Sequence, residues 1–546
     1  MKGIKIRFRA GRYLCVSFVM VVVSSALLNT VCYADTSLWS GDPLVTTLYG
    51  RVQGFEDNAS TFVWKAIPYA KPPVGAMRWK APQNPEPWSG IREENDFCSM
   101  CPQFGSIVIA GAQQGAIIGN EDCLYLNIWR PRSAQRNLPV FFWIHGGSNV
   151  QGSANPYSGT EIASRGNMVV VTINYRLGIF GWLTHPALRE GADDFTASGN
   201  YGTLDIIKAL AWVRDNIAAF GGDPNNVTIA GQSAGGINTL SLLISPVAKG
   251  LFHRVISQSG GLQPVSVQDG DAYTEQILKA LLVKDGTPED KADEVIAGMS
   301  NVEIKSYLYG KTTQELFEAI KGLRAGPTVF KDGVVLQSDG ADALNDPEKY
   351  NQVPVIIGST AEEGKLFMYL SGLHETWGPM LYQAIGRRAS QIARILSLDE
   401  IANRLAAHPT QPGVYCYVFQ FGMFRHCGYN AWPVDEGPNS RMSWAVALGS
   451  FHGLDIPFTF GLVKRFPLFF SIADKLFRED NRAGYEALSN AIMDYFAAFA
   501  RTGIPHPEGM PEWTKWPGRQ GMQKERFMLF DANDREAVLR MGYEAR

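Results

Sequence analysis

One short segment of the chain has the residue types and spacing of a nucleophilic serine. Ser233 lies in Gly231–Gly236 (GQSAGG), which follows the β-branched run Val227–Ala230 and precedes Ile237–Ile244, where apolar residues recur at helical spacing. In a Gly-x-Ser-x-Gly turn the serine is strained, and glycine is needed two residues to either side because a Cβ would crowd the turn. A chance match in a glycine-rich chain is the alternative, and the flanking strand and helix argue against it. We therefore predict that Ser233 projects its hydroxyl above a sheet.

The segments around this serine predict strands that alternate with helices. Thr203–Phe220 places apolar residues on one helical face, as expected for a helix that covers a sheet. The compact apolar runs expected as buried strands are Leu124–Trp129, Val140–Ile144, Val169–Asn174, Val227–Ala230 and Val353–Ile357. Alternating strands and helices indicate an α/β fold. Residues 44–69 predict a small antiparallel β region at one edge of the sheet, and residues 271–319 and 383–407 predict helical insertions that form pocket walls.

Composition excludes some classes of function. The chain has 546 residues, of which 45% are hydrophobic and 19% charged, as in a globular protein. Its formal net charge of −3 offers no basic surface for a phosphate backbone, which argues against nucleic-acid binding.

The N-terminus has the pattern of a targeting segment. Basic residues precede the uncharged stretch Tyr13–Ala34, and Cys32–Ala34 places small residues at −3 and −1 of a cut before Asp35. We therefore expect residues 1–34 to be a signal peptide and residues 35–546 to be exported as one domain, either secreted or periplasmic. The uncharged stretch is long enough to span a bilayer, so an uncleaved anchor is the alternative.

Export permits disulfide bonds. The cysteines that remain after removal of the signal peptide are Cys98, Cys101, Cys123, Cys416 and Cys427. One of these five must stay unpaired or bond elsewhere. No pair has the Cys/His spacing of a zinc site, so the sequence implies no metal.

Six motifs occur in order along the chain. They are Glu121–Asn127 (EDCLYLN), His145–Gly147 (HGG), Asn174–Gly178 (NYRLG), Asn200–Gly202 (NYG), Phe220–Pro224 (FGGDP) and Gly231–Gly236 (GQSAGG). Together they resemble the type-B carboxylesterase and cholinesterase family of α/β hydrolases. The resemblance covers nearly all of the mature chain. It implies an α/β-hydrolase fold, in which a mostly parallel sheet has helices on both faces.

The segment His145–Ser148 (HGGS) resembles the family's His-Gly-Gly-Gly, where backbone N–H groups stabilise the oxygen that becomes negative during acyl transfer. The resemblance implies that Gly147, Ser148 and Ala234 form this oxyanion hole and that His145 is structural. Ser148 departs from the pattern, because its Cβ stands where a glycine would allow the closest approach of a ligand. A plain glycine turn is the alternative for this segment.

The same resemblance assigns the other members of a catalytic triad. In α/β hydrolases the acid and then the histidine follow the serine. His452 lies in FHGLDIPF, which resembles the family's histidine loop, and His426 is the runner-up. The family's pattern of an acidic residue, a catalytic Glu and a Gly matches Glu362, Glu363 and Gly364. We therefore expect Glu363 to orient the imidazole of His452. Glu362 is the alternative acid, although we expect it to be a solvated neighbour.

The resemblance also implies supporting roles for residues outside the triad. Ser259 is similar to a family serine that supports the triad, with a simple turn after a strand as the alternative. Glu121, Arg176 and Asp205 resemble members of the family's internal ion pairs. Gln232 stands where cholinesterases carry Glu.

A disulfide pairing follows from the same resemblance. Cys101 and Cys123 resemble the family's bridged N-terminal loop, with Cys98 as the alternative to Cys101. Cys416 with Cys427 is a weaker second pair.

The resemblance implies an exported serine hydrolase that cleaves small-molecule carboxylic esters through an acyl-enzyme on Ser233, without a cofactor. A non-catalytic adhesion or binding module of the same fold is one alternative, and a lipase or amidase is another. Gln232, together with the absence of aromatic residues from Ile107–Asn120, predicts that uncharged esters are better substrates than choline esters.

Overall fold

The structure is a computed structural model. It describes residues 38–57, 60–106, 109, 112–324, 326, 328–423, 442–464, 476–519 and 526–543. Contacts divide the chain into Met1–Tyr33 and Ala34–Arg546, and all described residues belong to the second unit. The predicted signal peptide and the alternative of an anchor lie outside the described residues, so both stay predictions.

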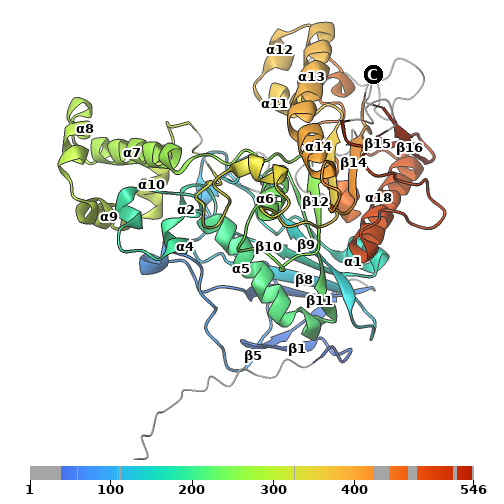
Figure 1. The fold of residues 1–546 in the computed structure, drawn as a ribbon, viewed down its shortest axis with the longest axis horizontal. Coiled ribbons are helices and arrows are strands. Elements are labelled where there is room, and N and C mark those ends of the chain that lie inside the picture. The colour runs from blue at the N-terminus through green and yellow to red at the C-terminus, as the bar shows by residue number, and fades with distance from the viewer. Residues whose placement is uncertain are drawn as a thin grey trace, which may run out of the picture. The chain divides into compact units, whose positions relative to one another are not determined.

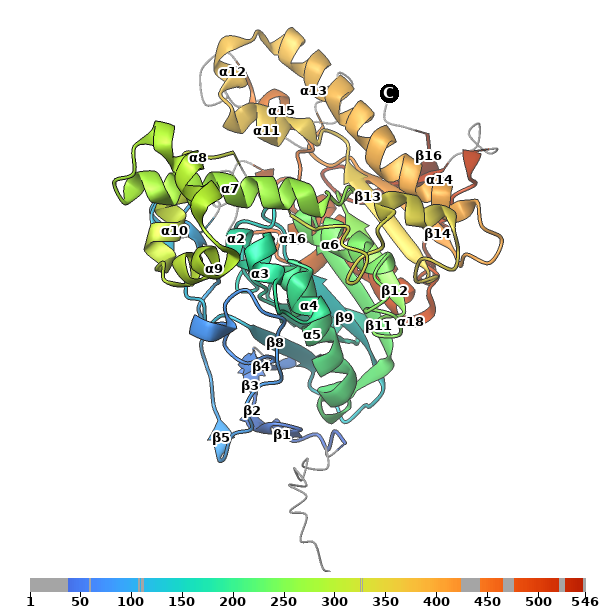
Figure 2. The same ribbon diagram turned by 60° about the vertical axis from the view of Figure 1, so that its left-hand side comes forward.

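A sheet of 11 strands forms the centre of the second unit (Figures 1 and 2). Its spatial order is β16-β15-β14-β13-β12-β11-β9-β10-β8-β4-β3. The strands are β3 (Phe55–Asp57), β4 (Thr61–Pro68), β8 (Tyr125–Pro131), β9 (Leu138–Ile144), β10 (Val169–Ile173), β11 (Gly222–Gln232), β12 (Arg254–Gln258), β13 (Val355–Thr360), β14 (Val414–Phe419), β15 (Phe527–Ala532) and β16 (Ala537–Gly542). In this spatial order, neighbouring strands from β10 through β9 and β11 to β15 are parallel, and the pairs at both ends of the sheet are antiparallel. The predicted α/β fold is therefore confirmed.

Both faces of the sheet are buried, which explains the continuous apolar runs of its strands. Along β9, Val140, Phe142 and Ile144 belong to one hydrophobic cluster, and the alternate residues Phe141 and Trp143 belong to another. The first cluster includes residues of α5 (Tyr201–Asn216) and α6 (Ala234–Leu243), whereas the second includes residues of α1 (Thr160–Gly166), α16 (Ile456–Phe460) and α18 (Arg482–Thr502). Figure 2 shows α5 in front of the sheet and α18 behind it.

The N-terminal β region is split between two sheets. The strands β1 (Leu44–Thr47), β2 (Gly50–Gln53) and β5 (Ile91–Arg92) form a separate small sheet. The next two strands, β3 and β4, join the edge of the main sheet, so the region extends that edge. A further pair, β6 (Gln103–Phe104) and β7 (Ile117–Ile118), stands apart from both sheets.

Two groups of helices contain the predicted insertions, and they stand apart in Figure 1. The first group is α7 (Val267–Lys284), α8 (Glu289–Gly298), α9 (Asn301–Tyr309) and α10 (Thr313–Ile320). The second is α11 (Gly364–Leu370), α12 (Leu373–Thr376), α13 (Pro379–Arg394), a π-helical turn (Ile395–Asp399) and α14 (Glu400–Ala406). The first group begins earlier than predicted, because Ser266 and Asp269 form a capping box at the start of α7. The second group begins at Gly364, well before the predicted start at residue 383.

Several shorter helices complete the described chain. They are α2 (Gly178–Gly181), α3 (Pro186–Arg189), α4 (Asp194–Ala197) and α15 (Trp444–Ala447), with 3₁₀ turns at Gly75–Met77, Ile217–Phe220 and Gly340–Asn345. Within the motif Phe220–Pro224, the strand β11 already begins at Gly222. Gly221 alone takes the left-handed conformation, with φ 79°, and Gly222 already pairs with Leu138 in the sheet.

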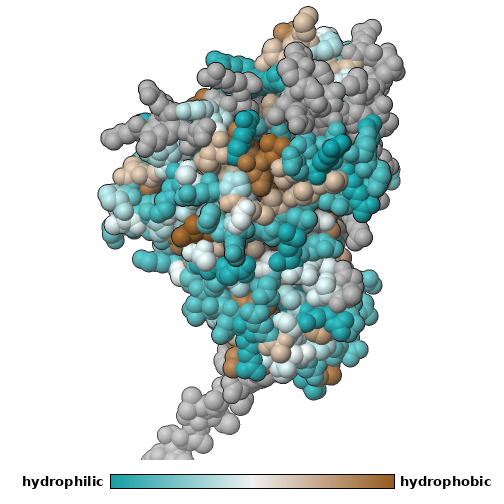
Figure 3. All heavy atoms as spheres, turned by 90° about the vertical axis from the view of Figure 1, so that its right-hand side faces the viewer, coloured by the Kyte–Doolittle hydropathy of each residue, from teal (hydrophilic) through white to brown (hydrophobic). Residues whose placement is uncertain are grey.

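The surface seen in Figure 3 is mostly hydrophilic, with a hydrophobic area, coloured brown, near its centre. Among the helices of the described residues, none combines the length and the hydropathy that crossing a bilayer requires.

Candidate active site

Ser233 occupies a sharp turn between β11 and α6. Its backbone has φ 58° and ψ −122°, a combination that residues other than glycine rarely adopt. A Cβ added at Gly235 would lie 2.0 Å from the carbonyl oxygen of Ile144, and one at Gly231 would lie 2.5 Å from the carbonyl carbon of Gly235. Both glycines are therefore required by close backbone approach, as the sequence predicted.

The parallel strands bring the candidate residues to one edge of the sheet. Ser233 follows β11, the segment from His145 follows β9, and Glu363 comes three residues after the end of β13. Parallel strands end at the same side of a sheet, so residues separated by more than 100 positions meet there.

His452 and Glu363 form a hydrogen-bonded pair. Nδ1 of the His452 ring bonds Oε2 of Glu363. The other carboxylate oxygen of Glu363 accepts hydrogen bonds from Ser259 Oγ (2.5 Å), the backbone N–H of Thr360 (2.7 Å) and Ser359 Oγ (3.1 Å). The carboxylate is therefore fixed from both sides. Sequence reasoning missed Ser359 and Thr360, although both immediately precede the acidic motif.

The pKa values of this pair shift in opposite directions. Burial by itself raises the pKa of Glu363, but the neighbouring His452 and the hydrogen bonds from His452 and Ser259 outweigh it and lower the pKa to about 2. Burial by itself lowers the pKa of His452, but the Glu363 carboxylate outweighs it and raises the pKa above the ordinary value. The carboxylate thus stays ionised and stabilises the protonated imidazole.

Gln232 contacts the other nitrogen of the same ring. Its side chain is buried, and its Nε2 lies 3.2 Å from Nε2 of His452. The residue before the serine therefore reaches the nitrogen that a general base would use.

The predicted oxyanion segment forms a tight turn after β9. Gly147 has φ 111°, and a Cβ there would lie 2.1 Å from the carbonyl oxygen of Gln151. Ser148 has φ 56°, so a non-glycine residue takes the left-handed conformation at this position. Ala234 is the first residue of α6, at the helix end whose N–H groups have no partner within the helix.

One cavity of about 360 Å³ joins these parts. Its lining includes Ser233, His452, Gly147 and Ser148. Among the described residues that line it, none is acidic. Residues of α11 form an apolar wall, with Phe367 placing its ring 5.2 Å from that of His452. Sequence reasoning missed this aromatic residue, because nothing in the α11 pattern indicates which side faces the cavity.

Glu362 is not the solvated neighbour that the sequence predicted. Its side chain is fully buried, with Lys365 Nζ at 2.8 Å and Arg387 Nε at 3.1 Å. Its Oε2 also accepts a hydrogen bond from the backbone N–H of Ser450, two residues before His452. The prediction was wrong because the charge is neutralised by partners on α11 and α13, which one sequence does not reveal.

The other predicted structural residues are paired inside the protein. Arg176 and Asp205 form a buried bidentate ion pair. Glu121 pairs with Arg78. His145 is buried and stacks on Tyr175, and burial lowers the pKa of its imidazole to about 4.

A disulfide joins Cys101 and Cys123, the pair that the resemblance implied. Cys98 and Cys416 have no disulfide in the described chain. Cys427 and the runner-up histidine, His426, lie outside the described residues. Within the described ranges no cluster of three or more His, Cys, Asp or Glu side chains is arranged to hold a metal.

Asp455 is a further buried carboxylate that sequence reasoning missed. It accepts hydrogen bonds from Tyr417 (2.7 Å) and Gln258 (3.3 Å), and burial raises its pKa to about 6. Its place three residues after His452, in the same motif, was the available signal.

Comparisons with known proteins agree with this architecture. Residues 41–392 match the model of the carboxylesterase family. The chain is 31% identical over 511 residues to para-nitrobenzyl esterase of Bacillus subtilis, an alignment that covers 89% of this chain and 94% of the relative. It is 30% identical over 535 residues to carboxylesterase 1C of Rattus norvegicus, with 92% of each chain covered. A solved carboxylesterase structure from Geobacillus stearothermophilus superposes with a TM-score of 0.70 at 29% identity and covers 91% of this chain and 97% of that one. The chain therefore belongs to the carboxylesterase family.

Proposed function

We propose that the chain, by its family a carboxylic-ester hydrolase, cleaves esters through an acyl-enzyme on Ser233, with His452 as general base and Glu363 as the orienting acid. One observation carries the proposal: Ser233 and His452 line the same cavity, and Nδ1 of His452 is bound to the partly buried, multiply hydrogen-bonded carboxylate of Glu363.

In the first half of the reaction, Ser233 Oγ attacks the carbonyl carbon of the ester while Nε2 of His452 accepts the hydroxyl proton. The carbonyl oxygen becomes negative and is stabilised by the backbone N–H groups of Gly147, Ser148 and Ala234. The C–O bond to the alcohol then breaks, and His452 returns its proton to the leaving alcohol.

In the second half, a water molecule attacks the acyl carbon and gives its proton to His452. The bond to Ser233 Oγ breaks, the serine recovers the proton, and the carboxylic acid leaves. Glu363 stays ionised throughout, because its pKa of about 2 lies well below neutral pH.

The substrate that we propose is a small-molecule ester whose groups around the reacting carbonyl carry no positive charge. The cavity walls contributed by α11 are apolar, and no acidic residue among the described ones lines the cavity. Relatives of this chain have names that specify esters of different kinds, para-nitrobenzyl esterase and a medium-chain fatty acyl-CoA hydrolase. Action on both oxygen esters and thioesters is consistent with the same acyl-enzyme chemistry.

We further propose that the chain works outside the cytosol. The Cys101–Cys123 disulfide supports this, because disulfides persist in oxidising compartments. The test is fractionation of expressing cells, with the N-terminal residue of the recovered enzyme determined. Mature enzyme that begins at Asp35 outside the cytosol supports the proposal, and full-length enzyme in the cytosol contradicts it.

The catalytic proposal is tested by Ser233→Ala, with hydrolysis of para-nitrophenyl butyrate as the assay. Loss of the nucleophile is expected to reduce kcat by several orders of magnitude, on the scale of about 10⁶. Ser371→Ala, on a serine just after α11 that does not line the cavity, is the matched control. Near wild-type activity of Ser233→Ala would contradict the proposal.

A further inference from the structure

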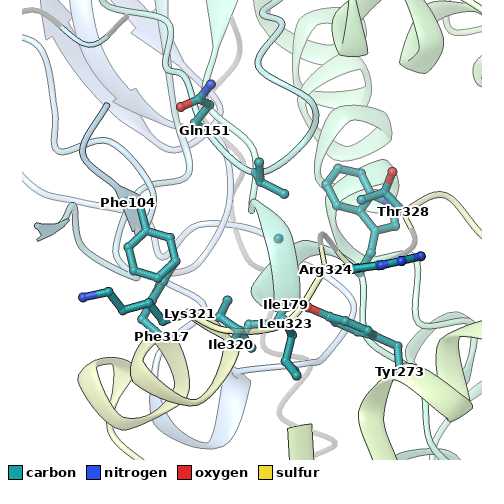
Figure 4. A pocket seen from close by; sticks show the side chains of 14 residues that line it. Phe104, Gln151, Ile179, Tyr273, Phe317, Ile320, Lys321, Leu323, Arg324 and Thr328 are labelled. Carbon is teal, nitrogen blue, oxygen red and sulfur yellow. The ribbon is translucent and has the colours of Figure 1, made fainter. Parts of the chain in front are cut away.

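A second cavity, of about 380 Å³, lies beside the candidate active site (Figure 4). Gln151 lines both cavities, and Val150 lines the second one. These residues end the turn that begins at Gly147, since the backbone N–H groups of both donate to the carbonyl oxygen of Gly147. The oxyanion turn therefore separates the two cavities.

The second cavity has an aromatic and aliphatic lining. Phe104 and Phe317 meet edge to face with their ring centroids 4.9 Å apart, and Ile179, Trp182 and Leu323 add apolar surface. Such a lining favours the binding of a hydrocarbon part of a ligand, because its burial removes apolar surface from water.

Two cationic side chains interrupt this apolar lining. Arg324 and Lys321 both line the cavity and are solvent-exposed. Figure 4 draws Arg324 between Thr328 and Tyr273, and Lys321 on the other side of the view, near Phe104 and Phe317.

Neither cation is neutralised by the residues around it. Within the described chain, the side chains of Lys321 and Arg324 form no ion pair, and no acidic residue lines the cavity. The nearby carboxylates of α10 are engaged locally, since Glu315 caps its helix through Thr312 and Glu318 accepts from Gln314. The cavity therefore combines an apolar lining with an uncompensated positive charge.

The second cavity is also linked to the catalytic side through Thr328, which lines it together with Arg324. Thr328 accepts a hydrogen bond from Asn149, at 3.5 Å, and Asn149 lies in the turn that also carries Gly147 and Ser148. Gln151, which lines both cavities, is the residue that a substrate extending from Ser233 into the positively charged cavity would pass.

We propose that this second cavity binds the distal end of the substrate and that Arg324 and Lys321 select esters ending in an anionic group, such as a carboxylate on an apolar chain. The inference rests on the proposed function, because the reacting carbonyl must lie at Ser233. Guanidinium and ammonium groups both donate hydrogen bonds to a carboxylate. Their exposure allows the anion to keep part of its hydration, so selection is expected to be moderate and sensitive to salt.

The test compares charged esters with neutral esters of matched length. One arm carries the charge on the acyl side, with the mono-para-nitrophenyl ester of octanedioic acid against its methyl ester. The other arm carries the charge on the alcohol side, with the acetate of ω-hydroxyheptanoic acid against its methyl ester. The two arms together show which half of the substrate enters the second cavity.

The variants replace each cationic side chain with a neutral, flexible one. Arg324→Gln with Lys321→Met is expected to lower kcat/KM for the charged ester of one arm about tenfold at low salt, and for the neutral ester less than twofold. High salt is expected to reduce the preference of the wild type in the same way. Lys291→Met, which removes an exposed charge from α8, is the control and is expected to change neither value.

The inference would be overturned if, in both arms, the double variant changed kcat/KM equally for the charged and the neutral ester or changed neither. Hydrolysis of the neutral esters shows whether the anion-binding inference or the proposed catalytic function is wrong. If their hydrolysis depends on Ser233 while the charged esters respond no differently to the double variant, the catalytic proposal stands and the second cavity is not an anion subsite.

Discussion

The side-chain nitrogen of Gln232 lies 3.2 Å from Nε2 of His452, the ring nitrogen opposite the one that bonds Glu363. The residue before the candidate nucleophile and the candidate base therefore touch, although 220 positions separate them in the sequence. The side-chain amide of Gln232 is neutral and therefore adds no charge beside the imidazole. A carboxylate at the same position would add a negative charge.

Gln232→Glu is expected to shift the pH dependence of hydrolysis. A negative charge beside His452 favours the protonated ring, so the pKa of His452 rises further above its ordinary value. The base must be neutral to accept a proton, and the acid limb of kcat/KM therefore moves to higher pH. Gln232→Met, which removes the amide without adding charge, is the control. Profiles of the two variants that coincide would refute the electrostatic explanation.

Substitution by Gln is expected to have different effects at the adjacent carboxylates Glu362 and Glu363, lowering stability at the first and kcat at the second. Glu363→Gln removes the charge that stabilises the imidazolium, so kcat falls by a factor on the order of 10⁴ in a folded protein. Glu362→Gln leaves the ammonium of Lys365 buried without its nearest counter-charge and lowers the free energy of unfolding by about 3 kcal/mol or more.

The measurements are kcat at saturating ester and urea unfolding of both variants. The pair of assignments is wrong if Glu362→Gln loses activity while its stability is unchanged, or if Glu363→Gln keeps wild-type kcat.

Ser259→Ala is expected to produce a smaller loss than Glu363→Gln. Ser259 donates a 2.5 Å hydrogen bond to Glu363, but Ser359 and the N–H of Thr360 still hold the same oxygen. A lost charge-assisted bond of about 1.5 to 3 kcal/mol, partly compensated, corresponds to roughly a tenfold fall in kcat. Removing Ser259 also removes a cause that lowers the pKa of Glu363. Unchanged kcat and an unchanged acid limb would show that Ser259 has no positioning role.

The central elements of the site were predictable because their signals are local. The glycines around Ser233 are required by backbone atoms within a few residues and by the neighbouring strand β9, so spacing alone identified the turn. The acid and the histidine needed family motifs as well, since nothing local distinguishes Glu363 from Glu362.

Features that depend on tertiary packing could not be predicted. The burial of Glu362 depends on Lys365 and Arg387, which come from two helices. The strands β12, β14, β15 and β16 were not predicted, although the sequence of β14, VYCYVF, is an apolar run no shorter than that of the predicted strand β13. Phe367 faces the active-site cavity from an insertion whose orientation no pattern specifies.

Uncharged esters are expected to be hydrolysed with higher kcat/KM than choline esters of the same acyl group. Gln232 supplies no negative charge, and none of the described residues that line the cavity is acidic. The aromatic residues Phe367 and Tyr157 line the cavity, and a cation over the face of one ring gains only about 0.5 to 2 kcal/mol. The comparison is butyrylcholine with its uncharged isostere, 3,3-dimethylbutyl butyrate, at low salt. Equal or faster turnover of the choline ester would contradict this expectation.

The Cys101–Cys123 bridge is expected to stabilise the N-terminal half of the chain. It closes a loop over a sequence separation of 22, which corresponds to about 3 kcal/mol in the chain-entropy model. The double variant Cys101→Ser with Cys123→Ser is compared with the wild type by urea unfolding without reductant. Peptide mapping that finds a free thiol at Cys123 in the wild type would reject the bridge.

Covalent trapping of the nucleophile tests the assignment of Ser233 directly. The enzyme is inactivated with diethyl para-nitrophenyl phosphate, which transfers its diethylphosphoryl group to an activated serine and releases para-nitrophenol. We expect one adduct per chain, located at Ser233 by peptide mapping and formed in step with the loss of esterase activity. An adduct at another residue that forms in step with inactivation, or full activity after Ser233 is modified, would contradict it.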